Sequence, residues 1–143
     1  MLIVRFRETF RDRQMEWALT AGATGWGLIL VRNPEVFARP FYAPLANMAS
    51  SDGWGWAMFM LGLLGLVVLF INGAWRRTPL FRQVASIGRM FAWFALFFGC
   101  VSAAGQSPAA MIYAMIACME AMALSNATAD GLKADAGIPA YGR

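Results

Sequence analysis

The sequence predicts an all-α integral membrane protein: four transmembrane helices in an antiparallel bundle, preceded by a short amphipathic N-terminal helix. Three observations predict this fold class. Of the 143 residues, 59% are hydrophobic and only 14% are charged, against roughly 25% charged residues in ordinary soluble domains. Four apolar runs each approach the roughly 20 residues that a helix needs to cross a bilayer. Arginines cluster just outside these runs, as is typical of spanning helices.

The first 14 residues predict the amphipathic helix. On a helical wheel, Leu2, Ile3, Phe6 and Phe10 share one face, and the charged side chains lie elsewhere. Such a helix is expected to lie on the inner leaflet of the membrane, and docking on a cytosolic partner is the alternative. Charges interrupt every apolar stretch here, so a removable signal peptide is not expected.

The four spans are predicted at residues 15–31, 54–75, 84–104 and 108–125. The second is the clearest, and the first is short and rich in glycine. Only "GQS" and then Pro108, a residue suited to a first helical turn, follow the third span. The last two spans are therefore expected to form a tight antiparallel hairpin. Residues 126–143 are small, polar and interrupted by Gly and Pro, which predicts a flexible cytoplasmic tail.

The connection "RNPEVFARPFYAPLANMASSDG" joins the first two spans. Its three prolines exclude a continuous helix. Phe37, Phe41 and Tyr42 indicate a segment that rests on the membrane surface. Ser51 and Asp52 are the expected N-caps of the second span.

Basic residues are unevenly divided between the two sides of the predicted membrane domain. Nine Lys and Arg residues share the side of both termini, and Arg32 and Arg39 share the other. The basic side is expected to be cytoplasmic, which places the chain in a bacterial inner membrane with both termini inside. The net charge of +4 is thereby explained without a nucleic-acid partner. Seven arginines are expected to contact lipid headgroups on that side: Arg5, Arg7, Arg11, Arg13, Arg76, Arg77 and Arg82.

Four polar residues, one from each predicted span, are expected near one level of the cytoplasmic half: Glu16, Asn72, Arg89 and Glu120. At about 1.5 Å per residue, Glu120 lies roughly 18 Å below Pro108, and Arg89 lies roughly 22 Å below Ala104. This similar depth predicts that Arg89 and Glu120 form an ion pair, which offsets the cost of burying either charge alone. The alternative is that Arg89 snorkels to phosphate while Glu120 faces other helices or is protonated. The four residues either lock the bundle or line a polar entrance from the cytoplasm.

Small residues at helical spacing predict close contacts between helices, because lipid tails provide no hydrophobic drive for helix association. The first span carries two such stripes, one through Gly22 and Gly25 and one through Ala23 and Gly27. The same faces can serve packing within one chain or self-association. The predicted packing positions are Gly22, Gly25, Gly62, Gly65, Ala114 and Ala117.

The sequence offers no constellation of residues for catalysis. It contains no histidine, no Gly-rich phosphate loop, and no Ser or Cys beside a plausible base. Bis-His haem ligation and most zinc sites are thereby excluded, and Cys100 and Cys118 are expected at different depths as unbridged packing residues. We therefore expect a non-enzymatic protein without cofactor or metal. Its expected partners are the bilayer and either itself or another membrane protein.

Three strings, "FRETFRDRQMEWAL", "GWGWA" and "INGAWRRTPLFR", carry a resemblance that covers most of residues 5–95. They resemble small multi-span membrane proteins encoded in tailed bacteriophages and prophages. The resemblance implies holins, which assemble in the inner membrane and permeabilise it, or proteins that exclude a second infection or occupy a host membrane complex. The tail departs from the basic cluster in which many holins end. A small transporter or an accessory subunit of a membrane complex is a further alternative.

Overall fold

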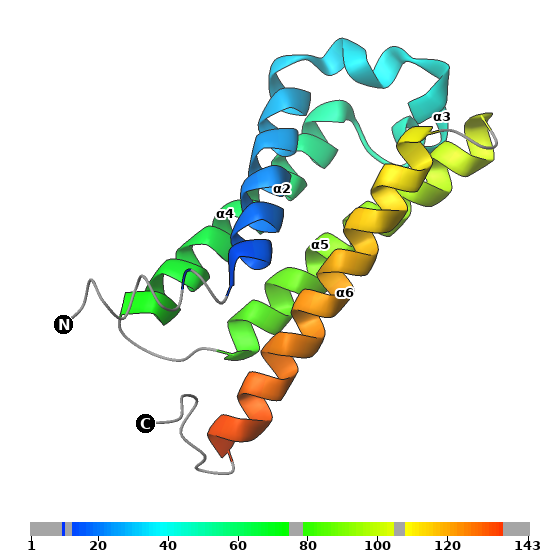
Figure 1. Ribbon diagram of the computed structural model, residues 1–143. Coiled ribbons are helices and arrows are strands. Elements are labelled where there is room, and N and C mark those ends of the chain that lie inside the picture. The colour runs from blue at the N-terminus through cyan, green and yellow to red at the C-terminus, as the bar shows by residue number, and fades with distance from the viewer. Residues whose placement is uncertain (1–9, 11–12, 75–78, 105–107, 136–143) are drawn as a thin grey trace.

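The computed structural model describes residues 10, 13–74, 79–104 and 108–135, and all regular elements among them are helical (Figure 1). The all-helical prediction is thereby confirmed. Two 3-10 helices and one short α-helix lie between the first two long helices: η1 (Pro34–Ala38), η2 (Pro40–Tyr42) and α3 (Ala43–Ala46). The long helices are α2 (Gln14–Arg32), α4 (Ser51–Ala74), α5 (Pro79–Ala104) and α6 (Pro108–Asp135).

Three helices in the described part of the chain, α4, α5 and α6, are long and apolar enough to cross a membrane. Their apolar windows have mean hydropathies of 2.2, 1.7 and 1.5. Helix α2 forms where the first span was predicted, but its Gly and Thr residues and its charged ends lower its hydropathy. The structure therefore supports membrane association through three helices.

The long helices form two antiparallel pairs. Helix α2 lies along α4, and α5 lies along α6, so the predicted hairpin of the last two long helices is present (Figure 1). The two pairs meet mainly where α5 packs against α4, and η2 and α3 also contact α5. Helix α5 is therefore the central element that joins the parts of the molecule.

Glycines bring α2 and α4 close together. A Cβ atom at Gly27 would overlap the backbone of Phe59, and one at Gly62 would overlap the backbone of Thr24. Gly62 and Gly65 therefore pack as predicted. Gly22 and Gly25 take no part in packing within the chain, because a Cβ atom at either would meet nothing within 4 Å. Self-association, the other role predicted for such a stripe, stays a prediction for these two. Of the two stripes on α2, the one through Ala23 and Gly27 faces α4.

The small residues of α6 pack against α5 with one shift from the prediction. Ala117 is fully buried, as expected, whereas Ala114 is only half-buried. Ala110 is also buried and occupies the corresponding position two turns before Ala117. The contact face of α6 thus follows a spacing of seven residues.

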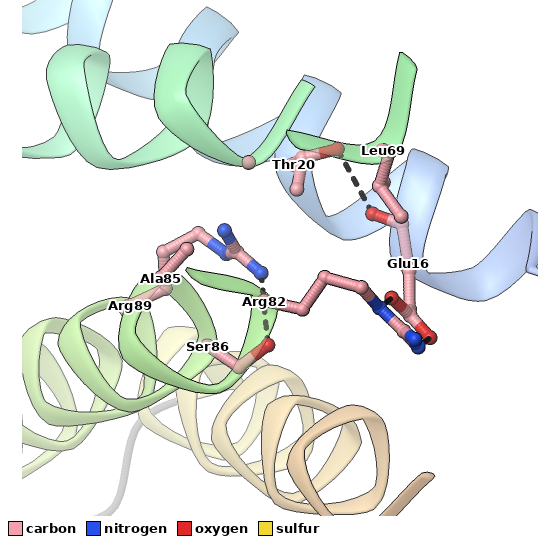
Figure 2. A pocket seen from close by; sticks show the side chains of 8 residues that line it. Glu16, Thr20, Leu69, Arg82, Ala85, Ser86 and Arg89 are labelled. Atoms are coloured by element: carbon pink, nitrogen blue, oxygen red, sulfur yellow. Dashed lines mark hydrogen bonds and ion pairs between the residues drawn. The ribbon is translucent and has the colours of Figure 1, made fainter. Parts of the chain in front are cut away.

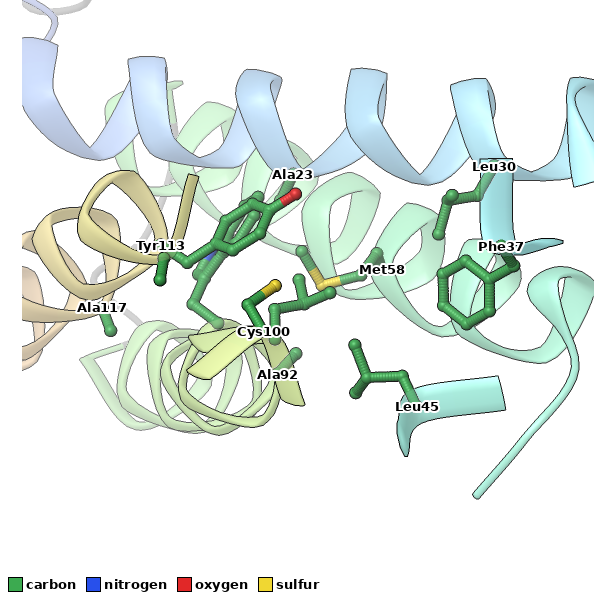
Figure 3. Packing of buried hydrophobic residues seen from close by; sticks show 12 residues of the cluster. Ala23, Leu30, Phe37, Leu45, Met58, Ala92, Cys100, Tyr113 and Ala117 are labelled. Atoms are coloured by element: carbon green, nitrogen blue, oxygen red, sulfur yellow. The ribbon is translucent and has the colours of Figure 1, made fainter. Parts of the chain in front are cut away.

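The apolar core lies toward the end where η1, η2 and α3 cover the long helices, which we call the aromatic end (Figure 3). Trp26, Trp93 and Tyr113 pack there with ring centroids 5.6–6.3 Å apart. Phe37 is only 6% exposed, and the Tyr42 and Tyr113 hydroxyls lie 2.8 Å apart in a hydrogen bond. The connection therefore packs against the long helices, and its expected position at the membrane surface stays a prediction.

Three predicted boundaries are also wrong, two of them at the opposite end. Helix α6 does not end at Ser125 but continues to Asp135, so residues 126–135 are helical rather than a flexible tail. Helix α5 begins at Pro79 instead of residue 84, because proline suits the first turn of a helix. Helix α4 begins at Ser51, and the Ser50 hydroxyl accepts a hydrogen bond from the Gly53 amide at 3.1 Å, so the cap lies one residue earlier than predicted.

The predicted amphipathic N-terminal helix lies almost entirely outside the described residues, as do the positions of five predicted lipid contacts. These five are Arg5, Arg7, Arg11, Arg76 and Arg77.

Candidate functional site

Six charged side chains from three helices and the residue before α2 form a network at the end opposite the aromatic end. We call this the charge network, and the end that holds it the charged end. Its members are Arg13, Glu16, Arg82, Arg89, Glu120 and Asp130.

The predicted ion pair between Arg89 and Glu120 is present. Arg89 Nε donates to Glu120 Oε1 at 2.6 Å, and Arg89 Nη2 donates to Glu120 Oε2 at 3.0 Å. This two-bond geometry suits the planar guanidinium group. The side chains are only 2% and 0% exposed, so Arg89 does not reach outward as the snorkelling alternative required. Arg89 Nη2 also donates to the Ser86 hydroxyl at 3.2 Å, one helical turn earlier.

Arg82 forms the second centre of the network, and the expectation that it contacts lipid headgroups is wrong. Its side chain is 4% exposed. Arg82 Nε and Nη2 donate to the two carboxylate oxygens of Glu16 at 3.0 and 2.5 Å, and Nη1 donates to Asp130 at 2.7 Å. Because α5 begins at Pro79, Arg82 lies inside the helix, two turns before Arg89 and on the same face.

Asp130 and Arg13 complete this centre. Asp130 is 36% exposed and accepts hydrogen bonds from Arg82 and, at 3.1 Å, from Arg13 Nη2. Sequence reasoning missed Asp130 because it assigned residue 130 to the tail. The available signal was the stretch from Ser125 to Asp130, which contains no glycine or proline to end α6. Arg13 was expected at lipid headgroups and instead pairs with α6.

The predicted grouping of four polar residues near one level is thus present in part. Glu16 is 6% exposed and belongs to the network, although its partner is Arg82. Asn72 lies in α4, but its side chain is outside the described residues. The arginine side chains tie α2, α5 and α6 together, because Arg82 bridges α2 to α6 and Arg89 bonds to α6.

A small pocket with both polar and apolar lining lies between the two centres of the network, where α2, α4 and α5 meet (Figure 2). Glu16 and Thr20 line it from α2, and Arg82, Ser86 and Arg89 line it from α5. Gly65 and Leu69 line it from α4, and a Cβ atom on Gly65 would overlap Arg89 Nη1. The glycine is therefore required for the guanidinium group to lie where it does.

The outward faces of α4, α5 and α6 are apolar. Bulky side chains are largely exposed along each of them, including Phe70 at 59%, Phe91 at 66% and Met111 at 64%. An apolar surface of this extent is costly in water, whereas lipid chains would cover it. Five of the six residues of the charge network are at most 14% exposed, so the distribution of polarity is compatible with membrane association.

Within the described residues, the charge network contains three guanidinium groups and three carboxylates in two separate groups. Arg82 and Arg13 pair with Glu16 and Asp130 in one group, and Arg89 pairs with Glu120 in the other. No group of three or more His, Cys, Asp or Glu side chains there could hold a metal ion. Comparison of the chain with protein families, with curated proteins and with solved structures finds no match.

Proposed function

We propose that this chain is a non-catalytic inner-membrane protein of holin type that acts by self-association in the bilayer. In this proposal α2 is a fourth spanning helix, and the charged end faces the cytoplasm together with both termini. The uneven distribution of basic residues supports this orientation.

The pairing of Glu16 supports the insertion of α2. An isolated carboxylate would cost about 2.5–3.5 kcal/mol at the centre of a spanning helix. Glu16 instead lies near the start of α2 and accepts two hydrogen bonds from Arg82. Helix α2 also runs along α4, so one of its faces is covered by protein rather than lipid.

The observation that carries the proposal is the uncovered small-residue stripe of α2. The stripe through Ala23 and Gly27 is used against α4, whereas Ala18, Gly22 and Gly25 are exposed. Small residues allow two helices to approach closely in a bilayer, and such contacts drive association there. The second stripe is therefore available to a second copy of the chain. The phage resemblance noted above gives this association a biological role, which is permeabilisation of the membrane by assembled copies.

Induced expression with culture density and membrane potential as readouts tests the proposal. We expect a delayed loss of potential and of culture growth in cells that express the wild-type chain. Gly25→Leu should prevent this loss, because leucine blocks close approach at the uncovered stripe without disturbing α4. Cys118→Leu is the matched control, since Cys118 is a small, exposed residue on α6. Sustained growth with intact potential in wild-type cells would overturn the holin assignment.

A second candidate function is favoured by exposed apolar residues at the charged end. Leu80, Phe81 and Leu132 are 65%, 55% and 66% exposed where α5 begins and α6 ends. A membrane-anchored protein that occupies a host complex, excludes a second infection or serves as an accessory subunit would use such a surface. A photo-crosslinking amino acid at position 132 tests this candidate. Adducts with one host membrane protein and unimpaired growth would favour it, whereas only lipid adducts or self-adducts would count against it.

A further inference from the structure

The outward face of α6 carries a seam of residues that is separate from the buried face of this helix. The seam residues recur every three or four positions, as in one seam of a coiled coil: Met115, Met119, Met122, Asn126 and Ala129. Met119 is half-buried, and the other four are exposed. The buried face contains Ala117, Glu120 and Ala127 instead. The seam is therefore presented to molecules outside the chain.

Asn126 is the polar member of this seam. Its side chain is exposed, and no hydrogen bond joins it to another of the described residues. The hydroxyls of Ser125 and Thr128, by contrast, donate to carbonyl oxygens one turn earlier in α6, at 3.0 and 2.9 Å. A carboxamide has two N–H donors and an oxygen atom that can accept two hydrogen bonds. Asn126 therefore has unused hydrogen-bonding capacity on the outer surface of α6.

Asn126 lies at a level where the neighbouring helix has an apolar surface. Gln83 Nε2 donates to the Thr128 hydroxyl at 3.4 Å, so this part of α6 runs beside the first turns of α5 (Figure 1). The large apolar side chains on those turns are 38–65% exposed: Leu80, Phe81, Val84 and Ile87. The apolar window of α6 itself extends to Leu132, beyond Asn126. In such surroundings a polar side chain stabilises association by forming a hydrogen bond to another helix.

The chemistry of Asn126 favours a second copy of the chain as the partner. A carboxamide is self-complementary, because its N–H group can donate to the oxygen atom of an identical carboxamide. Copies that are inserted with the same orientation have parallel α6 helices, so Asn126 can meet Asn126 across a twofold axis. A single Asn in such a seam fixes the register of parallel helices. The flexible Met side chains around it can adapt to the facing surface.

We propose that the outward face of α6 is a second self-association surface, in which Asn126 forms a hydrogen bond with Asn126 of another copy. The inference rests on the proposed function, because it assumes that copies assemble in one bilayer with one orientation. A twofold contact through the α2 stripe alone is complete with two copies. A second twofold contact through α6 joins such pairs into a continuing row, which is the kind of assembly that permeabilisation requires.

Cysteine crosslinking of the full chain in membranes tests the proposal. In a Cys118→Ala background, which leaves only the buried Cys100, we expect Met122→Cys to form a disulfide-linked dimer on mild oxidation. The matched control is Met60→Cys on the outward face of α4, because Met60 is 53% exposed and Met122 is 59% exposed. The control should form little dimer. The proposal is overturned if Met122→Cys forms no more dimer than Met60→Cys.

Substitutions of Asn126 test the hydrogen bond itself. Asn126→Leu in the Met122→Cys chain should lower the dimer yield about tenfold, which is the effect of one hydrogen bond between helices in a bilayer. Asn126→Gln keeps the carboxamide and should restore most of the yield. Because Asn126 is exposed, neither substitution should disturb the packing of α6 against α5. An unchanged yield with Asn126→Leu would contradict the proposal.

The crosslink also separates this inference from the holin assignment. Gly25→Leu, which blocks the α2 stripe, should leave the Met122→Cys crosslink in place, because the two surfaces lie on different helices. A crosslink in cells that keep their growth and membrane potential would support the α6 surface and overturn the holin assignment. Loss of potential in cells that form no crosslink would overturn the α6 surface and leave the holin assignment in place.

Discussion

The two ends of the molecule join the same helices by different physical means. At the charged end, Arg82 and Arg89 connect α2, α5 and α6 through directional bonds to three carboxylates. At the aromatic end, Trp26, Trp93 and Tyr113 pack through ring contacts, and the described residues offer no acceptor for the buried Trp93 Nε1. The charged end therefore specifies which helices meet and at which register, whereas the aromatic end supplies buried area.

This difference predicts unequal tolerance to substitution. A buried ion pair contributes little net stability compared with a well-packed apolar replacement. Removal of one partner is nevertheless strongly destabilising, because it leaves the other charge buried without compensation. A packed apolar site loses stability in proportion to the volume removed and tolerates side chains of similar size. Single substitutions can therefore distinguish the two ends.

The largest effect is expected for Glu120→Ala. It leaves Arg89 buried without its carboxylate, and we expect the free energy of unfolding to fall by about 3–5 kcal/mol. Equilibrium unfolding in mixed detergent micelles, followed by tryptophan fluorescence, measures this change. The double variant Arg89→Met with Glu120→Gln should be more stable than the sum of the two single effects predicts. Simple additivity would show that the pair does not contribute to stability.

A smaller loss is expected at the aromatic end for Leu45→Ala. Leu45 is 1% exposed and packs against Gly99 of α5, where a Cβ atom would overlap its side chain. We expect the free energy of unfolding to fall by about 2–3 kcal/mol. This is toward the low end for such truncations, because α3 is short and can relax into the cavity that the substitution leaves. The same unfolding assay measures it. Leu45→Met should cost less than about 1.5 kcal/mol, and an equal loss for both variants would contradict this account of the aromatic end.

Sequence reasoning identified the helices and one half of the charge network. Apolar runs fix where a helix can form, and depth along two antiparallel helices was sufficient to pair Arg89 with Glu120. The Arg82 centre was missed because a basic residue beside an apolar run has the same sequence pattern whether it faces lipid headgroups or a carboxylate. Only the start of α5 at Pro79 decides between these orientations.

The choice between the two stripes of α2 illustrates the same limit. Gly22 and Gly27 have equivalent small-residue patterns, and helical spacing alone does not say which stripe faces α4. The structure decides in favour of Gly27, where Phe59 of α4 approaches most closely. Rotation of a helix about its axis is set by tertiary contacts, and these are not encoded in the local pattern.

The smallest effect is expected for Tyr113→Phe, which removes the hydrogen bond between the Tyr42 and Tyr113 hydroxyls. We expect a loss of about 0.5–1.5 kcal/mol, the usual net contribution of one hydrogen bond. The lower half of this range is expected because Tyr42 is only half-buried, so its hydroxyl can find another partner. A double-variant cycle with Tyr42→Phe isolates the contribution of the bond.

Tyr113→Phe also tests whether the two ends are energetically independent. Tyr113 and Glu120 lie seven residues apart on α6, about 10 Å along the helix axis. Substitutions at this separation without shared partners add to within about 0.5 kcal/mol. We therefore expect Tyr113→Phe and Glu120→Ala to be additive in the unfolding assay. A coupling above 1 kcal/mol would show that the aromatic end and the charge network form one cooperative unit through α6.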